Sequence, residues 1–219
     1  MTPERFRRIR AILERRQPDL TVLLENVHKP HNLAAILRTA DAVGLYRAHA
    51  VVPDRELRTS LVSASGAHKW VDVEQHDSLG AALAALGRQG LQVLAAHPDA
   101  NAVDYRTVDF TQPSAILFGQ ELDGLSRDAL AAAAVKIKVP MAGFVTSLNV
   151  SVAAAIVLFE AMRQRTAAGL YETCRLAPEE FERRLFEWTY PKLADLCRHR
   201  SAPYPALDDQ GELLGPVPR

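Results

Sequence analysis

The chain has 219 residues, 48% of them hydrophobic, and its 26 basic side chains balance 26 acidic ones. This length allows one sizeable core with small additions, and the neutral total excludes a simple polycation. No segment reaches the roughly 20 apolar residues of a membrane helix, and residues 1–20 lack a secretory cleavage pattern, so we expect no membrane contact and a cytoplasmic location.

Two features of composition bear on partners. Cys174 and Cys197 lack metal-ligand spacing and are too few for a disulfide scaffold, which predicts a reduced protein without a metal site. Residues 1–20 carry six arginines against three acidic residues. Such a basic segment can bind a polyanion, although the same arginines could simply solvate a surface helix.

Apolar periodicity predicts alternating strands and helices. In chain order we expect a helix over 3–16, a strand over 21–25, a helix over 32–43, a strand over 46–52, a helix over 78–89, strands over 91–96 and 114–118, a helix capped by Ser126, a strand over 135–139 and a long helix over 149–165. This alternation predicts a doubly wound, mostly parallel sheet, with ligands beyond the carboxyl ends of its strands.

The composition of three regions supports more specific predictions. Residues 150–159 are apolar nearly all round, which is typical of a buried helix. Residues 178–198 predict one amphipathic helix. Residues 201–219 are rich in Pro, Gly and Asp and predict a loose tail.

The first polar segment, ENVHKPHN at residues 25–32, follows the first strand. Asn32 could be a helix N-cap, and Arg38, opposite the apolar stripe, could be a solvated charge. Together with His28 and His31, these side chains could instead bind phosphate and ribose oxygens at a helix start.

The second segment, GQELDGL at residues 119–125, follows the strand SAILF. Glycines permit a tight turn or a close approach of the backbone to a ligand. The segment is neither a dinucleotide-binding fingerprint nor a phosphate-binding P-loop. An ordinary strand-to-helix turn explains this segment as well as a ligand-binding loop does.

The third segment runs from Val139 through a Pro–Gly loop into Ser147, Asn149 and Ser151. An N-capped core helix explains part of this pattern. It leaves unexplained the crowding of polar side chains at the start of a buried helix, since buried polar groups need partners.

The order and spacing of these segments closely resemble one family over nearly the whole chain. The stretches RRQPDLTVLLE, VHKPHNLAAILRTADAVG, GQELDG and SLNVSVAAAIVLFEAMRQR resemble the SpoU/TrmH branch of the SPOUT methyltransferases. The resemblance is greatest to members that methylate the ribose 2′-hydroxyl of guanosine 18 in the tRNA D-loop.

The resemblance implies an architecture beyond the doubly wound sheet. It implies a deep trefoil knot at the C-terminal end of an α/β domain over 19–165, flanked by an N-terminal basic helix over 1–18 and a C-terminal extension over 166–219. Both extensions would bind tRNA, and the protein would act as a homodimer. Knots are rare, and no periodicity argument predicts one.

The resemblance also implies a pocket for S-adenosylmethionine (AdoMet) formed by the knot. Its walls would be residues 94–96, 118–121, 137–141 and 147–150, with cofactor contacts from Ala96, Gly119, Val139, Met141, Leu148 and Asn149. Relatives often carry Thr where this chain has Ala96, so a backbone contact would survive there and a hydroxyl contact would not.

By the same resemblance, Arg38, oriented by Asn32, would remove the proton of the ribose hydroxyl near the cofactor of the partner subunit. Because arginine stays charged, stabilising the developing alkoxide or holding a phosphate are alternatives. Glu121, Ser147 and Asn149 would shape the catalytic site. Contacts with RNA are expected from Arg7, Arg8, Arg15, Arg16 and His31.

Other functions remain open at this point. An enzyme of the same fold could methylate ribosomal RNA or another tRNA position, and a non-catalytic RNA-binding module could share the fold. The missing dinucleotide fingerprint argues against a nicotinamide-dependent dehydrogenase.

Overall fold

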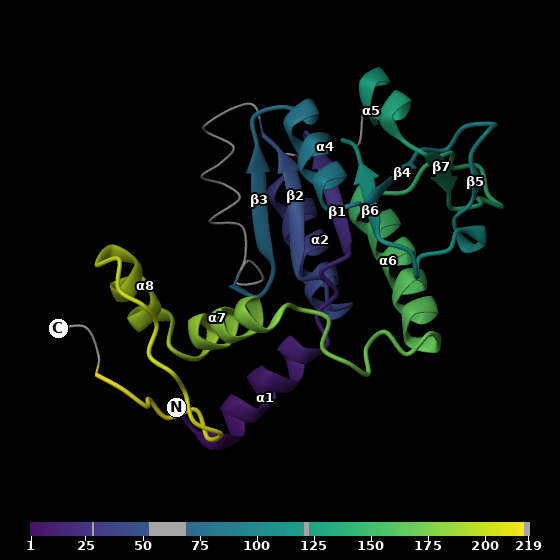
Figure 1. Ribbon diagram of the computed structural model, residues 1–219. Coiled ribbons are helices and arrows are strands. Elements are labelled where there is room, and N and C mark those ends of the chain that lie inside the picture. The colour runs from purple at the N-terminus through teal and green to yellow at the C-terminus, as the bar shows by residue number, and fades with distance from the viewer. Residues whose placement is uncertain (28, 53–68, 121–122, 217–219) are drawn as a thin grey trace. The chain divides into compact units, whose positions relative to one another are not determined.

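The computed structural model describes residues 1–27, 29–52, 69–120 and 123–216 (Figure 1). The chain forms two compact units. One spans Gln17–Leu170, and the other combines Met1–Arg16 with Tyr171–Arg219. We call them the sheet unit and the helical unit.

The sheet unit contains a parallel sheet of seven described strands in the order β3-β2-β1-β6-β4-β7-β5. The strands are β1 (Leu20–Glu25), β2 (Arg47–Val51), β3 (Asp72–His76), β4 (Gln92–Ala96), β5 (Val103–Asp104), β6 (Ser114–Phe118) and β7 (Val135–Lys138). The predicted doubly wound parallel sheet is confirmed. The sequence had not predicted β3 and β5, and the knot stays a prediction.

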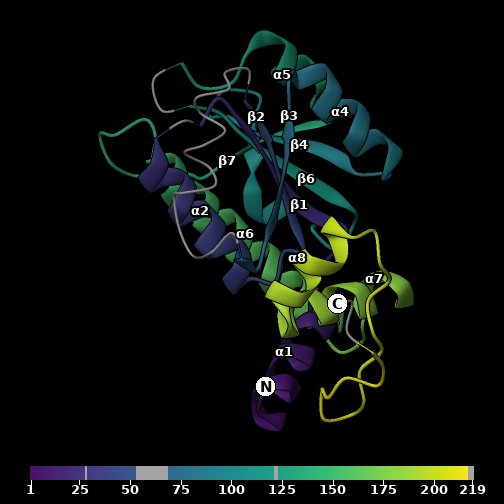
Figure 2. The same cartoon turned by 90° about the vertical axis from the view of Figure 1, so that its left-hand side faces the viewer.

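Helices cover both faces of this sheet. On one face lie α2 (Pro30–Ala42) and α6 (Val150–Ala167), and on the other lie α4 (Leu79–Arg88) and α5 (Arg127–Ala132) (Figure 2). A short 3₁₀ helix, η2 (Tyr105–Thr107), follows β5. Every residue of β1 is buried because helices pack above and below the central strands, which explains its nearly continuous apolar sequence.

The long helix α6 is not buried all round. Val152 is 46% exposed and Phe159 is 52% exposed, while Ala154, Val157 and Leu158 pack into the core. The prediction of a fully buried helix is therefore wrong for this chain, since α6 packs by one side only. Among the described residues, no helix combines the length and the apolar character needed to cross a membrane.

The helical unit contains α1 (Pro3–Glu14), α7 (Pro178–Thr189) and α8 (Pro191–His199). The single helix predicted over 178–198 is wrong, because it breaks at Tyr190, whose φ and ψ are −129° and 63°. The ring of Pro191 disfavours helical backbone in the preceding residue and removes a backbone donor.

The tail beyond α8 has irregular backbone but is anchored within the helical unit. The Tyr190 hydroxyl donates to the carbonyl of Gly211 over 2.8 Å, and Tyr204 stacks on Phe186 with ring centroids 4.6 Å apart. Gly211 has a φ of +84°, and a Cβ there would lie 2.5 Å from the Phe6 ring. The predicted loose tail is therefore wrong for the described residues.

A buried arginine joins three segments of the sheet unit. Arg165, on α6, is 0% exposed. Its guanidinium donates to the Asp19 carboxylate over 2.7 Å, to the side-chain oxygen of Gln17 over 2.9 Å and to the carbonyl of Phe110 over 2.8 Å. Its remaining bonds reach the carbonyls of Asp19 and Gln112, so the buried charge is extensively hydrogen-bonded. These contacts fix α6 against the start of β1 and the segment before β6.

Replacing Arg165 should therefore destabilise the sheet unit strongly. We expect Arg165→Met to lower the free energy of unfolding by about 3–5 kcal/mol. The substitution removes a buried charge and leaves the groups that accepted its hydrogen bonds without a donor. Arg163→Met is the matched control, since Arg163 lies on the same helix and pairs with Glu160 with 67% of its side chain exposed. That change should cost less than about 1 kcal/mol. Urea unfolding followed by circular dichroism measures both, and equal losses would contradict the assignment.

Candidate functional site

The three polar segments leave the same edge of the sheet. Because all the strands are parallel, the segments after β1, β6, β4 and β7 emerge at their carboxyl ends, and these four strands are neighbours. After β1 the chain enters α2 on one face, and after β6 it enters α5 on the other. Adjacent strands whose connections leave to opposite faces form the crevice in which such sheets bind ligands.

A contact between two asparagines joins the first and third segments. The Asn149 side-chain NH₂ donates to Oδ1 of Asn32 over 3.1 Å. Asn149 also caps α6, because its Oδ1 accepts from the backbone N–H of Ser151 over 2.9 Å and from the Ser151 hydroxyl over 2.6 Å. The structure thus brings together two of the predicted catalytic residues.

Asn32 does not cap α2. The helix begins two residues earlier, at Pro30, with Lys29 as its N-cap. Proline fits the first helical position, where its missing N–H would have no partner in the helix. Asn32 therefore lies inside the helix and is only 2% exposed, with its side chain directed to α6 rather than to the end of its own helix.

Arg38 lies further along α2 and is exposed, as the sequence predicted. Six residues separate it from Asn32, which places its Cα about 9 Å along the helix axis. As an exposed side chain of the sheet unit, Arg38 is accessible to an incoming ligand.

The turn after β6 is closed by backbone contacts. The N–H of Gly124 donates to the carbonyl of Gln120 over 3.0 Å, and Gly124 has a φ of +66°. A Cβ on Gly119 would lie 2.1 Å from the carbonyl oxygen of Gly124, a distance that no side chain allows. Gly119 is therefore required for the turn. The predicted catalytic residue Glu121 lies outside the described residues, as does His28 of the first segment.

A buried carboxylate connects this turn to β1. Glu25 is 5% exposed, and its oxygens accept from the Ser126 backbone N–H over 2.9 Å and from the Ser126 hydroxyl over 2.6 Å. The Ser126 hydroxyl also accepts from the Ala129 N–H, which confirms its predicted role as the N-cap of α5. A negative charge is favourable at a helix N-terminus. Glu25 thus ties the first segment to the second.

The loop before α6 mixes half-buried and exposed side chains. The predicted cofactor contacts Val139, Met141 and Leu148 are half-buried, as is Ala96 at the end of β4. Ser147 is exposed, and Phe144 at the tip of the loop is fully exposed. The loop therefore lines the carboxyl edge with partly accessible apolar groups.

An ion pair supports the neighbouring segment after β4. Lys136 donates to the Asp99 carboxylate over 2.8 Å, and this bond lowers the pKa of Asp99 below its usual value. Lys138 donates to the backbone carbonyl of Asp99 over 3.2 Å. Both lysines belong to β7, so these bonds hold the end of β4 beside β7 and fix the backbone that follows Ala96.

The predicted RNA contacts differ in exposure. Arg7, Arg8 and Arg15 are exposed in the helical unit, and His31 is exposed in the sheet unit. Arg16 is only 1% exposed, and its guanidinium lies 5.2 Å from the centre of the Trp188 ring. A cation buried over an aromatic face gives up contact with solvent and packs in the interior of its own unit.

Sequence reasoning missed the link between Glu25 and Ser126. The available signal was a single acidic residue ending the strand LTVLLE, in which every other residue except Thr21 is apolar. A carboxylate buried at that point requires a donor, and the donor that the fold supplies, Ser126, is 101 residues away in the sequence.

Comparison with known proteins places the chain in a family. Residues 19–159, more than half of the chain, match the SpoU rRNA Methylase family, and residues 163–216 match the SpoU, rRNA methylase, C-terminal family. The chain belongs to the SpoU methylase family. A SpoU relative from Escherichia coli strain K12, a tRNA (guanosine(18)-2′-O)-methyltransferase, is 51% identical over 97% of this chain and 94% of its own length.

Solved SpoU structures share the fold. The crystal structure of the A. aeolicus TrmH/SpoU tRNA modifying enzyme aligns with a TM-score of 0.77 and 38% identity, over 86% of this chain and 96% of that one. The SpoU methyltransferase AviRb from Streptomyces viridochromogenes, in complex with the cofactor AdoMet, aligns with a TM-score of 0.61 and 27% identity, over 70% and 62% of the two chains.

The bond between Glu25 and Ser126 predicts energetic coupling. In a double-mutant cycle of Glu25→Gln and Ser126→Ala, we expect a coupling of about 1–3 kcal/mol, because the bonds involve a buried charge. Ser78 provides the control, since it caps α4 through the Ala81 N–H in the same way but does not contact Glu25. Glu25→Gln with Ser78→Ala should be additive within about 0.5 kcal/mol. Urea unfolding gives each value, and additivity in the first cycle would refute the link.

Proposed function

We propose that this SpoU methylase transfers a methyl group from AdoMet to the ribose 2′-hydroxyl of guanosine 18 in the D-loop of tRNA. The observation that carries the proposal is the similarity to the E. coli enzyme, which covers nearly the full length of both chains. A shared core alone would support only a methyltransferase of this fold. Similarity that extends through both ends of the chain supports the same RNA substrate.

The carboxyl edge of the sheet fits the adenosyl part of AdoMet. Small-molecule sites are mostly apolar, with a few polar groups that orient the ligand. The Gly119 turn offers backbone groups without side chains, and Val139, Met141 and Leu148 offer half-buried apolar surface. The SpoU methyltransferase AviRb was crystallised in complex with AdoMet, which supports this choice of cofactor. When bound, AdoMet supplies an electrophilic methyl group on a sulfonium.

The protein itself contributes by aligning the substrate with the methyl group and by stabilising charge on the reacting oxygen. Arg38 offers a guanidinium, a group that can hold a substrate phosphate and stabilise negative charge that develops on the 2′ oxygen. The bond from Asn149 to Asn32 fixes α2, which carries Arg38, against the start of α6. Alignment of two reactants can contribute about 7–11 kcal/mol in ideal cases.

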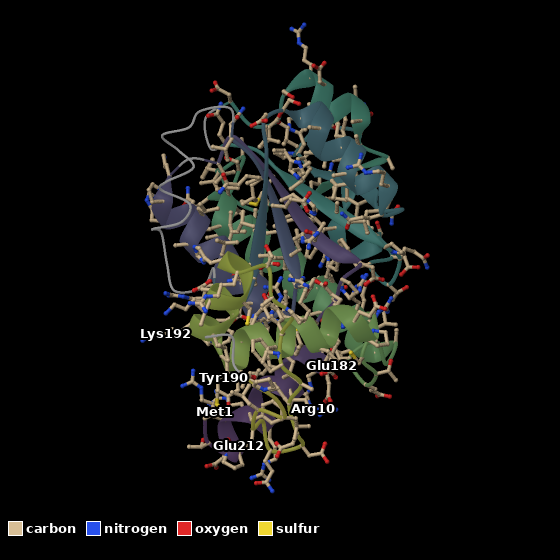
Figure 3. All side chains as sticks on the ribbon, turned by 60° about the vertical axis from the view of Figure 1, so that its left-hand side comes forward. Met1, Arg10, Glu182, Tyr190, Lys192 and Glu212 are labelled. Carbon is tan, nitrogen blue, oxygen red and sulfur yellow. The ribbon has the colours of Figure 1, made fainter. Side chains whose placement is uncertain are left out.

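Exposed cations of the helical unit suit the tRNA backbone. Arg7, Arg8 and Arg15 are exposed, and Arg10 and Lys192 also project outward (Figure 3). Binding through phosphate contacts weakens as salt rises, because condensed counterions must be displaced. We leave Arg16 out of this surface, since its guanidinium is buried against Trp188.

The exposed stripe of α6 supports a homodimer. Val152 and Phe159 lie seven residues apart on one side of this helix and are about half exposed. Two copies that bury these stripes against each other would also explain why the sequence of α6 is apolar nearly all round. In such a dimer the exposed Arg38 of one copy would serve the cofactor site of the other.

We place the reaction in the cytoplasm. Cys174 is exposed and Cys197 is buried, and both are free thiols. Unpaired cysteines are typical of proteins from reducing compartments.

The substrate is tested by methyl transfer from labelled AdoMet to an unmodified tRNA transcript. We expect label on this transcript and none on a copy in which guanosine 18 is replaced. A ribosomal RNA fragment serves as the competing substrate. Label on ribosomal RNA alone, or on both tRNA transcripts equally, would refute the assignment to guanosine 18.

The same assay tests Arg38. We expect Arg38→Ala to lower the rate roughly 100-fold or more, because it removes charge stabilisation at the reacting oxygen. Arg88→Ala, which removes an exposed arginine from α4 on the opposite face of the sheet, should leave the rate within about twofold. A similar rate for both variants would exclude a catalytic role for Arg38.

A substitution at Gly119 tests whether AdoMet binds at this turn. Gly119→Ala forces the turn apart, and backbone strain of about 1–3 kcal/mol corresponds to a loss of roughly tenfold or more in AdoMet affinity. Gly87→Ala is the control, since a Cβ at that helical position meets nothing within 4 Å. Calorimetry measures both affinities. If correctly folded Gly119→Ala protein bound AdoMet with unchanged affinity, the cofactor site would have to lie elsewhere.

The dimer proposal predicts that these two variants complement each other. In a mixed dimer, the copy with Arg38→Ala keeps an intact cofactor site, and the copy with Gly119→Ala supplies an intact Arg38. Co-refolded variants should therefore regain one working site per mixed dimer in the methyl-transfer assay. Arg38 acting within its own subunit would give no recovery, although both variants dimerise in analytical ultracentrifugation.

A further inference from the structure

Three side chains with metal-binding atoms meet on the side of the sheet unit away from β4, β7 and β5. His49 belongs to β2, and Glu74 and His76 belong to its neighbour β3. In the parallel register His49 lies opposite Glu74. Because side chains alternate along a strand, Glu74 and His76 point to the same face, and His49 joins them there.

The geometry of this cluster is compact. Nδ1 of His49 lies 2.9 Å from Nε2 of His76. The Glu74 carboxylate lies 4.0 Å from the His49 nitrogen and 3.8 Å from the His76 nitrogen. One donor atom from each residue falls within 4.8 Å of the other two.

Burial makes the two histidines unusual. His49 is 0% exposed and His76 is 8% exposed, and their rings stack with centroids 5.2 Å apart. In the described part of the chain, no group hydrogen-bonds the buried Nε2 of His49. Polar groups that are buried at such a cost usually serve a purpose beyond packing.

We propose that His49, Glu74 and His76 form a binding site for a divalent transition metal ion, with Zn²⁺ as the best-fitting ion. Zinc takes imidazole nitrogen and carboxylate oxygen ligands at about 2.0–2.2 Å in a tetrahedral arrangement, which separates neighbouring ligand atoms by about 3.3 Å. The two imidazole nitrogens lie 2.9 Å apart, while Oε1 of Glu74 lies 3.8 Å from the His76 nitrogen and Oε2 lies 4.0 Å from the His49 nitrogen. Forming the site therefore requires side-chain rotations that bring one Glu74 oxygen closer to both rings.

The 2.9 Å contact between the two rings is a hydrogen bond, so one imidazole nitrogen donates and the other accepts. An ion in the cluster would take the place of the shared proton, because metal binding needs both nitrogens in their deprotonated form.

Arg47 acts on the carboxylate from outside the cluster. Its guanidinium donates to Oε2 of Glu74 over 3.0 Å, which leaves Oε1 on the side of His76. Partners of this kind orient a ligating carboxylate. The same positive charge opposes an incoming cation, so we expect weaker binding than at a cysteine-rich zinc site.

The site would stabilise structure and would take no part in methyl transfer. β3 is the outermost strand on this side of the described sheet, and its ligands would clip it to β2. Glu74 has 37% of its side chain exposed, so the fourth ligand position can hold water. The sequence predicted no metal site from its cysteines, and only the pairing of β2 with β3 brings these ligands together.

The test uses the full-length, untagged protein after chelator treatment and dialysis. Calorimetry with Zn²⁺ should show one ion per chain, and Co²⁺ should give the intense visible absorption of a four-coordinate ion. Thermal unfolding should shift to higher temperature with Zn²⁺, because an ion that binds only the folded state stabilises it. Absence of stoichiometric binding by the wild-type protein would overturn the proposal.

Variants localise the ion. We expect His76→Gln and Glu74→Gln each to weaken Zn²⁺ binding at least tenfold and to remove the Co²⁺ absorption. The two residues are less buried than His49, so these variants keep the test valid if His49→Gln fails to fold. His199→Gln, which changes an exposed histidine of α8, is the control and should bind as wild type. Undiminished binding in the His76 and Glu74 variants would refute the site.

Measuring the rate of methyl transfer distinguishes a failure of the zinc-site proposal from a failure of the proposed function. The rate measured with chelated protein at a temperature well below unfolding should match that of the Zn²⁺-loaded protein. Loss of activity on chelation would overturn the structural role assigned to the ion. An inactive protein that still binds Zn²⁺ through these residues would instead contradict only the proposed function.

Discussion

The buried guanidinium of Arg165 is the contact on which the sheet unit depends. It lies on α6 and bonds to Gln17 and Asp19 before β1 and to the carbonyl of Phe110 before β6, two segments that are distant from each other and from α6 in sequence. A planar group with five fixed donors can satisfy several acceptors at once, which a lysine could not. With α6 held there, its opposite end presents Asn149 to Asn32, so the candidate site is assembled from a helix that is anchored at its far end.

The sequence predicted those elements that depend on interactions between residues close together in the chain. Ser126 is an N-cap because its hydroxyl accepts a bond three residues on, and β6 is a strand because SAILF is a short apolar run before a glycine. The glycine turn, the exposed Arg38 and the polar start of α6 were also visible in the sequence. The family resemblance, rather than periodicity, supplied their functional meaning.

What the sequence left open depends on which strands become neighbours. β3 carries the polar residues Asp72, Glu74 and Gln75 and gives no apolar signal, and it forms a strand because it pairs with β2. The cluster around His49 follows from that pairing, as the bond between Glu25 and Ser126 follows from the pairing of β1 with β6. The break at Pro191 was predictable, since proline in a helical pattern is a local signal, but the amphipathic pattern on either side outweighed it.

The carboxylate of Glu25 also has a thermodynamic consequence. It joins the segment that leads into α2 to the turn that leads into α5, and these helices lie on opposite faces of the sheet. A ligand that shifts one of these segments therefore acts on the other through a single buried carboxylate. In a transferase that binds two substrates, such coupling is reciprocal: each substrate would change the affinity for the other by the same factor, without any change in the arrangement of the strands.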